Sequence, residues 1–120
     1  IVLKSEGKPI RTYTYVADAV CALFYILLNS DDVVYNISSE DATVSIRQLA
    51  EALVGAYPER GLKLVFDLPK TSENTGCAPF TLGILNSDKL KALGWKPIYS
   101  LTEGLKRTVT YLETELNSED

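Results

Sequence analysis

The chain has 120 residues, of which 46% are hydrophobic and 23% are charged, and its formal net charge at pH 7 is −4. This length supports one domain with a hydrophobic core, but not a separate cofactor-binding domain as well. The acidic balance argues against a nucleic-acid-binding surface, which needs clustered Lys and Arg, and the absence of His excludes metal sites built on imidazole and triads with a His base.

The first expected elements are an extended segment and a long apolar helix. Thr and Tyr alternate in Ile10–Tyr15, after a Gly-Lys-Pro turn, and this pattern favours a short strand. In Val16 to about Asn29, apolar residues keep the i, i+3, i+4 spacing of a buried helix face. Asp18 falls in the first turn, where a carboxylate meets the positive end of the helix dipole, so its expected role is structural.

A short buried strand and a second helix are expected next. The run Val33–Ile37 is rich in β-branched and aromatic residues, which predicts the strand, and a polar loop follows at Ser38–Thr43. Ser45 and Gln48 have the spacing of a capping box, so the second helix is predicted to begin at Ser45. An apolar stripe continues until Pro58, where the helix should end.

Hydrophobic residues then alternate with other residues in Leu62–Leu68, which predicts a half-buried strand. The following stretch, Pro69–Ile84, is rich in Pro, Gly, Asn, Ser and Thr. A long irregular connection inside a small domain is typical of a binding loop, and we interpret it as functional.

The final part of the chain predicts two more helices. A short one is expected at Ser87–Leu93, ended by Gly94, and Trp95 in the next turn is expected to lie in the core rather than to stack on a base. Ser100 and Glu103 repeat the capping-box spacing and open a final amphipathic helix.

Cysteine usage and the absence of targeting segments favour a cytoplasmic protein. Cys21 lies in the first helix and Cys77 in the long loop, so no C-x-x-C motif is formed and reduced thiols are expected. The longest apolar stretch, Ala19–Leu28, is about half of the roughly 20 residues that a bilayer span needs. No secretory signal is present. We therefore expect no membrane partner.

Four separated pieces of sequence resemble a single family. Together, in this order and at these spacings, they resemble the C-terminal, substrate-binding part of NAD-dependent sugar-nucleotide epimerases and dehydratases, the extended short-chain dehydrogenases. The pieces are the G-x-x-I-R-x-Y-x-Y-V-x-D run of Gly7–Asp18, Val34–Ile37, Ser87–Leu90 leading to Leu93–Pro97, and Leu101–Leu105.

The resemblance implies a mixed α/β fold of about four helices with a few short strands. Residues 1–120 would be a single substrate-binding domain without its NAD-binding Rossmann half. The seven Gly residues never form G-x-x-G-x-x-G, and none of the seven Tyr residues has Lys four positions later. No catalytic residue and no NAD site is therefore expected in this chain, which should be inactive in isolation. Epimerisation, dehydration, reduction and decarboxylation all stay open for the parent enzyme.

Arg11 and Tyr13 are the candidate substrate-binding residues. The resemblance implies that Arg11 contacts the diphosphate of a nucleoside-diphosphate sugar, because a planar guanidinium can donate two parallel charged hydrogen bonds; the alternative is an ordinary solvated Arg. Tyr13 and Tyr15 alternate with Thr, so one can face a ligand while the other packs, and packing alone is the alternative for both.

One departure from the family pattern concerns a second phosphate-binding Arg. Many members carry it in the region that matches Ser72–Cys77, where this sequence has no Arg. Lys63 or Lys70 could substitute as a point charge.

Other functions stay open. The chain could be a stand-alone α/β protein-interaction or ligand-binding module, or a small enzyme in its own right, although a small enzyme would need a base and only scattered Asp and Glu are available. Under the family interpretation, the expected partners are the nucleotide sugar, the Rossmann domain of the same protein and a second copy in a homo-oligomer. Self-association is expected because surface meant for burial would be exposed.

Overall fold

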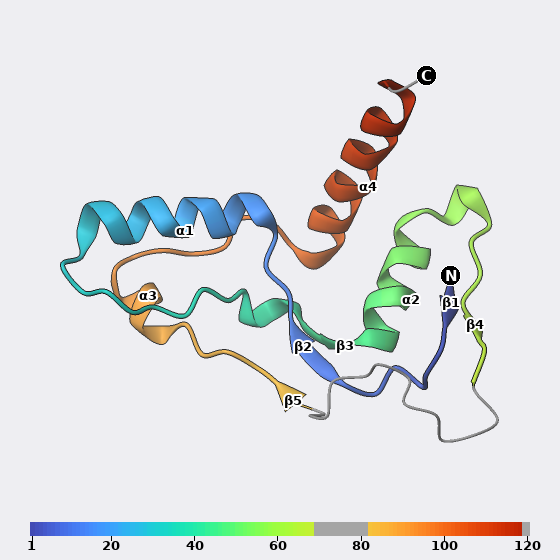
Figure 1. The fold of residues 1–120 in the computed structure, drawn as a ribbon, viewed down its shortest axis with the longest axis horizontal. Helices are drawn as coiled ribbons and strands as arrows, with labels where there is room; N and C mark the ends of the chain where they lie inside the picture. Colours follow the sequence, from blue (N-terminus) through green and yellow to red (C-terminus); the bar gives the residue numbers. More distant parts are fainter. Residues whose placement is uncertain (69–81, 119–120) are drawn as a thin grey trace.

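The computed structural model describes residues 1–68 and 82–118, which form a mixed α/β arrangement (Figure 1). The expectation of four helices with a few short strands is confirmed for these residues. In chain order the elements are β1 Val2–Leu3, β2 Ile10–Thr12, α1 Val16–Asn29, the 3-10 turn η1 Glu40–Ala42, β3 Thr43–Ser45, α2 Ile46–Ala56, the 3-10 turn η2 Pro58–Arg60, β4 Val65–Phe66, β5 Leu82–Gly83, α3 Asp88–Ala92 and α4 Leu101–Ser118.

The strands form two small sheets. β1 pairs with β4 in parallel, and the other sheet has the order β3-β2-β5. Its central strand, β2, runs antiparallel to β3 and parallel to β5. The hydroxyls of Thr12 and Thr43 lie 3.0 Å apart across the first of these pairs, which reinforces the register. β2 thus joins segments that lie far apart in the sequence.

The core lies between α1 and α3. Ala22, Leu90 and Trp95 are almost fully buried and form one cluster, against which Tyr35 and Ile37 pack. The expectation that Trp95 is a core residue is therefore confirmed. Gly94 ends the α3 region at a φ of 104°, a conformation that suits glycine.

Asp18 connects the start of α1 to the segment that precedes α4. Its side chain is 1% exposed, and its carboxylate accepts hydrogen bonds from the backbone N–H groups of Ile98, at 2.9 Å, and Tyr99, at 3.1 Å. Asp18 is therefore structural, as expected, but it binds a distant backbone segment rather than the amides of its own helix. This interaction fixes where α4 begins relative to α1.

Local signals predicted α2 correctly. Ser45 and Gln48 form both hydrogen bonds of the capping box, at 2.8 and 3.1 Å, and Arg47 pairs with Glu51 at 3.0 Å. Ser100 likewise accepts a hydrogen bond from the N–H of Glu103 at the start of α4. α1 also spans the expected residues.

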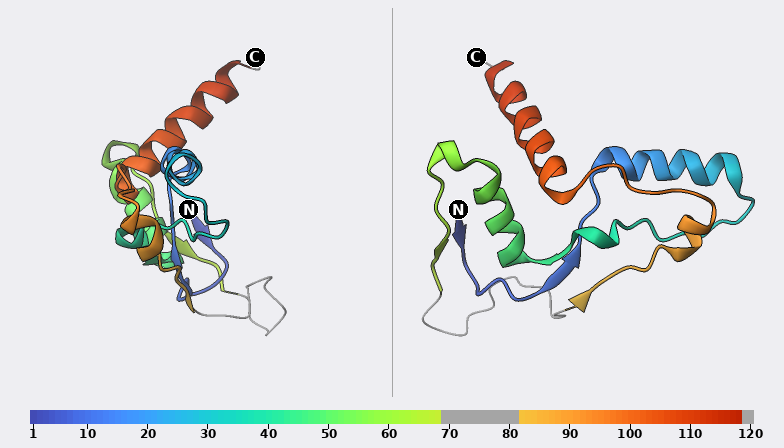
Figure 2. Two further views of the ribbon diagram at one scale, coloured as in Figure 1. Left: turned by 90° about the vertical axis from the view of Figure 1, so that its left-hand side faces the viewer. Right: turned by 180° about the vertical axis from the view of Figure 1, so that it is seen from behind.

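The last helix packs on α2 through its N-terminal part and then extends away from the strands (Figure 2). The hydroxyl of Tyr57 donates to the carbonyl of Lys106 at 3.2 Å, and Arg60 forms a two-pronged ion pair with Glu113. None of the described helices combines the length and the apolar character that a membrane span requires.

Two expectations about the segments around α1 are wrong. The strand predicted at Val33–Ile37 does not form, and Val33 is 91% exposed and Val34 68% exposed. The face of α1 predicted to be buried is exposed as well, with Leu27 at 73% and Leu28 at 78%. In both cases the sequence has the pattern of a buried element, but the residues that the structure describes supply no paired strand for Val33–Ile37 and leave most of this face of α1 uncovered.

Two further expectations hold only in part. The strand expected over Leu62–Leu68 is reduced to β4, although Leu64 and Phe66 keep the predicted half-buried positions. Most of the loop interpreted as functional, Pro69–Ile84, lies outside the described residues, as does Cys77.

Replacing Asp18 tests the link between α1 and α4. Asp18→Ala would leave two amides without their buried acceptor, so we expect the free energy of unfolding to fall by about 2 to 4 kcal/mol. Urea unfolding monitored by the fluorescence of Trp95 measures the change. Asp31→Ala, which removes an exposed carboxylate, is the control and should change stability by less than about 0.5 kcal/mol. Equal losses in the two variants would contradict the assigned role.

Candidate functional site

Arg11 occupies the central position of the three-stranded sheet. Across the sheet it lies opposite Val44 of β3 and Gly83 of β5. It is half-buried, and its Nη1 atom donates to the carbonyl of Ile10 at 2.7 Å. Gly83, its neighbour on β5, has no side chain. Because β2 is paired with β3 on one side and with β5 on the other, the backbone at Arg11 has little freedom to move.

Tyr13 follows Arg11 by two residues, so both side chains lie on the same side of the extended segment. The backbone N–H of Tyr13 donates to the carbonyl of Ala42 at 3.1 Å, which continues the pairing of β2 with β3. Burial raises the pKa of the Tyr13 hydroxyl, and the positive charge of Arg11 opposes this shift. The charge of Arg11 is thus felt at the Tyr13 hydroxyl.

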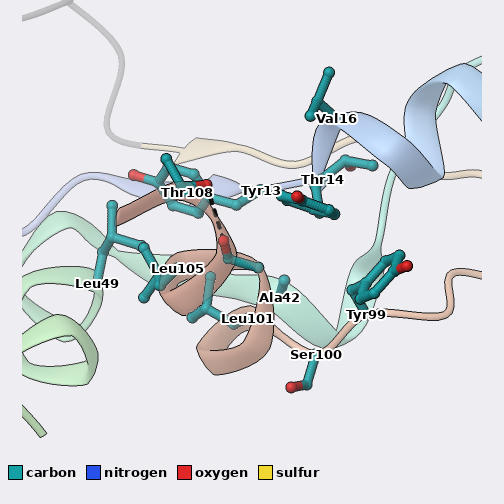
Figure 3. Close-up of a pocket in the computed structure, with 12 residues that line it drawn as sticks. Tyr13, Thr14, Val16, Ala42, Leu49, Tyr99, Ser100, Leu101, Leu105 and Thr108 are labelled. Carbon is teal, nitrogen blue, oxygen red and sulfur yellow. Dashed lines mark hydrogen bonds between the residues drawn. The ribbon is translucent and has the colours of Figure 1, made fainter. Parts of the chain in front are cut away.

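A cavity of about 380 Å³ opens beside Tyr13 (Figure 3). Its walls come from the link between β2 and α1, from α2 and from the first turns of α4, and they are mostly apolar and aromatic. Tyr13, Leu105 and Thr108 all line it. Arg11 lies outside the lining of this cavity, so the structure separates the two candidates: Tyr13 borders the cavity and Arg11 does not.

Tyr15 packs where α1 and α4 begin. Its ring meets that of Tyr99 edge to face, with centroids 5.0 Å apart and planes inclined by 69°. On the other side it lies against Gly104, where an added Cβ would come within 3.2 Å of the Cβ of Tyr15. Of the two tyrosines, Tyr15 is thus the one held by close packing.

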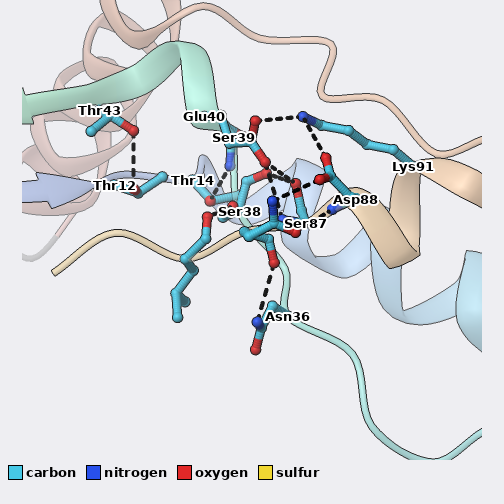
Figure 4. A network of polar contacts seen from close by, with 12 residues as sticks. Thr12, Thr14, Asn36, Ser38, Ser39, Glu40, Thr43, Ser87, Asp88 and Lys91 are labelled. Atoms are coloured by element: carbon cyan, nitrogen blue, oxygen red, sulfur yellow. Dashed lines mark hydrogen bonds and ion pairs between the residues drawn. The ribbon is translucent and has the colours of Figure 1, made fainter.

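A polar network joins the loop before β3 to the start of α3 (Figure 4). Glu40 accepts from the backbone N–H and the hydroxyl of Ser87, at 3.1 and 3.2 Å, and forms an ion pair with Lys91 at 2.7 Å. The hydroxyl of Ser87 also contacts the carbonyl of Ser38 at 3.0 Å, and the hydroxyl of Ser38 donates to the carbonyl of Leu85 at 2.6 Å. These bonds hold the loop before β3 against the segment between β5 and α3.

The charges of this network shift the pKa values of Glu40 and Lys91. The hydrogen bond from Lys91 is the largest cause that lowers the pKa of Glu40, followed by the backbone N–H of Ser87. The same contact raises the pKa of Lys91. Sequence reasoning missed the network, because its partners lie far apart in the chain and no local motif joins them.

Of the two lysines proposed as substitutes for a second phosphate-binding Arg, the structure describes Lys63. Lys63 precedes β4 and lies beside the two-stranded sheet, where its carbonyl accepts from the N-terminal ammonium at 2.8 Å. Lys70 and Ser72–Cys77 lie outside the described residues.

The described residues do not fit a dinucleotide cofactor. A Gly-rich turn at a helix N-terminus is the usual cradle for a pyrophosphate. The four described helices are instead preceded by Thr14-Tyr15, Val44-Ser45, Asn86-Ser87 and Tyr99-Ser100. Gly7, which has a positive φ, is approached closely by the backbone of Arg47, so that a side chain would not fit at this position, and Gly7 precedes no helix directly.

Comparison with known proteins gives relatives over nearly the whole chain. UDP-D-apiose/UDP-D-xylose synthase 2 of Arabidopsis thaliana is 28% identical over an alignment of 123 positions, which covers 93% of this chain and 31% of that protein. UDP-glucose 4-epimerase of Thermotoga maritima, solved with UDP-glucose, is 30% identical with a TM-score of 0.75, over 97% of this chain and 35% of that one. No protein-family model matches the sequence.

A third similarity concerns the fold alone. The dTDP-glucose 4,6-dehydratase of Bacillus anthracis, solved in complex with NAD, has a TM-score of 0.71 at 21% identity, over 94% of this chain and 34% of that one. The chain thus spans about a third of the length of each of these proteins.

Fold and sequence together define the class to which the chain is related, namely enzymes that modify sugar nucleotides on an α/β scaffold. Within this class, the chain is a homologue of the NAD-dependent sugar-nucleotide epimerases and dehydratases, the extended short-chain dehydrogenases, and it matches their C-terminal portion. The resemblance found in the sequence motifs is confirmed.

The network around Glu40 predicts a pH dependence of stability. Because the pKa of Glu40 is lowered in the folded state, its ionised form stabilises the fold at neutral pH, and this contribution is lost as the pH falls below about 4.3, the ordinary pKa of Glu. We expect the native chain to unfold at higher urea concentration than Glu40→Gln at pH 7, and the difference to vanish at acidic pH.

Glu115→Gln, which alters an exposed carboxylate of α4, is the matched control. It should show little difference from the native chain at either pH. A Glu40→Gln difference that stays constant from pH 7 down to pH 3 would contradict the ion pair as its cause.

Proposed function

We propose that residues 1–120 form a single substrate-binding domain of an NAD-dependent nucleotide-sugar epimerase or dehydratase, whose cofactor-binding domain lies in another part of the same polypeptide. The observation that carries this proposal is the match over 97% of the chain to an epimerase solved with UDP-glucose, of which the chain covers 35%. The structural neighbour solved with NAD supports this cofactor for the parent enzyme. The bound molecule would be a nucleoside-diphosphate sugar.

Arg11 would hold the diphosphate. A guanidinium on a central strand, with a glycine as its neighbour on β5, can approach two phosphate oxygens without a large change of conformation. Its present hydrogen bond to the carbonyl of Ile10 keeps the side chain close to the sheet, from which it can turn toward a ligand. Arg11 would position the substrate and would not react.

Tyr13 would support this contact. It follows Arg11 by two residues, and its hydroxyl is protonated at neutral pH, as an ordinary phenol is, with burial raising its pKa further. A protonated phenol can donate a hydrogen bond to an anionic or hydroxylated ligand.

The residues of this chain would bind substrate, and the chemistry would take place on another part of the protein. The chain carries neither the glycine-rich turn nor a Tyr-x-x-x-Lys pair, so hydride and proton transfer would depend on the other domain. The domain alone would bind substrate and would not turn it over.

Replacing Arg11 tests the diphosphate assignment. In the complete enzyme, Arg11→Ala should weaken the binding of a UDP-sugar by about 1.5 to 3 kcal/mol, roughly 10- to 150-fold, because a charged hydrogen-bond donor is lost. Isothermal titration calorimetry measures the affinity. Arg60→Ala removes an Arg whose partner is Glu113, and this control should bind as the native enzyme does. Unchanged affinity in Arg11→Ala would remove the assignment.

Replacing Tyr13 separates ligand contact from packing. Tyr13→Phe keeps the ring and removes only the hydroxyl, so a hydrogen bond to substrate would be lost at a cost of about 0.5 to 1.5 kcal/mol in binding, with the thermal midpoint nearly unchanged. An affinity equal to that of the native enzyme would assign Tyr13 to packing alone.

A further inference from the structure

The two strands that flank Arg11 continue into segments that are bonded to each other. The loop of residues 38–42 precedes β3, and residues 84–87 follow β5. Because β3 runs antiparallel to β2 and β5 runs parallel to it, both segments lie at the C-terminal end of β2, next to Tyr13 and Thr14. Any contact between them therefore also sets the distance between the two neighbours of Arg11.

Side chains of both segments make this contact, and we call it the Glu40 network (Figure 4). The Ser38 hydroxyl donates to the carbonyl of Leu85 at 2.6 Å, and the Ser87 hydroxyl contacts the carbonyl of Ser38 at 3.0 Å. Ser38 and Ser87 are each 1% exposed. Hydrogen bonds shielded from water in this way are electrostatically stronger than the same bonds in solvent.

Glu40 supplies the charged part of the network. Its Oε1 atom accepts from the backbone N–H and the hydroxyl of Ser87, at 3.1 and 3.2 Å, while its Oε2 atom lies 2.7 Å from Nζ of Lys91. Hydrogen bonds to an ionised group are roughly twice as strong as those between neutral groups. Lys91 lies 4.0 Å from Asp88, too far for a hydrogen bond, so Asp88 does not replace Glu40 as its acceptor.

The loop that contains Glu40 is bonded in turn to the strand that carries Arg11. The backbone N–H of Ser39 donates to the Thr14 hydroxyl at 3.1 Å. The N–H of Tyr13 donates to the carbonyl of Ala42, also at 3.1 Å. An unbroken path of hydrogen bonds thus leads from α3 through the loop to the C-terminal end of β2.

The position of Arg11 depends on this path more than on its own side-chain contacts. Its backbone is fixed between Val44 of β3 and Gly83 of β5, and the Glu40 network ties together the segments next to these two strands. A guanidinium binds a diphosphate well only when two donors face two oxygens, so a small shift of the strand costs affinity. Residues that fix such a geometry without touching the ligand contribute to binding through the contact residue.

We propose that Glu40 is a positioning residue for the nucleotide sugar: it holds the loop before β3 against the segment after β5, and so keeps Arg11 where the diphosphate is bound. Glu40 acts through Arg11 and does not touch the ligand. This inference rests on the proposed function, because that function assigns the diphosphate to Arg11.

Binding of UDP-glucose to the complete enzyme, measured by isothermal titration calorimetry, tests this role. Glu40→Ala should weaken binding about 2- to 30-fold, the range expected for a residue that acts through a network. The measurement is made at a temperature at which circular dichroism shows native helix content. Glu113→Ala breaks an ion pair of similar chemistry between α4 and η2, and this control should bind as the native enzyme does.

A second variant keeps the test valid if Glu40→Ala folds poorly. Lys91→Met retains a long side chain and removes the charge that pairs with Glu40, so it should weaken binding in the same direction. Unchanged affinity in the folded variants would overturn the inference.

A double-mutant cycle separates positioning from general destabilisation. In an Arg11→Ala background, Glu40→Ala should reduce the affinity by a factor much closer to one, because the guanidinium that it positions is absent. If Glu40→Ala does not fold, Lys91→Met takes its place in the cycle. An equal fold loss in both backgrounds would show that Glu40 acts independently of Arg11 and would overturn the inference.

The same titrations keep the two proposals distinct. A native enzyme that binds no nucleotide sugar would remove the proposed function, and this inference with it. An enzyme that binds UDP-glucose and is weakened by Arg11→Ala, but loses the same factor through Glu40→Ala in both backgrounds, keeps the proposed function and loses only the positioning role of Glu40.

Discussion

The arrangement of the domain depends on one buried carboxylate. The side chain of Asp18, in the first turn of α1, accepts two hydrogen bonds from the backbone of Ile98 and Tyr99, about 80 residues later in the chain. Because a buried anion without donors is costly, the segment before α4 is confined to the position in which both amides reach it. Tyr99, held there, meets the ring of Tyr15, and the cavity beside Tyr13 takes its shape from this meeting.

The features that sequence reasoning obtained correctly are governed by neighbours in the chain. The bounds of α1, the capping box of Ser45 and the cap of Ser100 depend on spacings of a few residues, and the structure has all of them. Trp95 was assigned to the core from its size and its place between two helices, and it lies there. These signals are local, so the printed sequence contains them in full.

The features that were missed depend on distant partners. The network of Glu40, Ser87 and Lys91 joins residues about 50 positions apart, and no spacing rule connects them. For Val33–Ile37 the local pattern predicted a buried strand, but a strand needs a second chain segment to pair with, and the described residues provide none. The placement of Arg11 opposite Gly83 likewise required the register of β2 and β5.

Arg11 and Tyr13 are two residues apart in the sequence but lie in different surroundings. Arg11 carries fixed charge at the middle of a sheet and Tyr13 borders an apolar cavity, although both arise from the same short run of sequence.

Gly104 offers a way to change this region without altering any polar contact. At this position the α4 backbone approaches Tyr15 so closely that a single methyl group would have to displace the ring. The close approach of α4 to Tyr15 at the wall of the cavity thus depends on the absence of a side chain at Gly104. A side chain at position 104 would therefore change how α4 meets Tyr15 and would leave Arg11 unaltered.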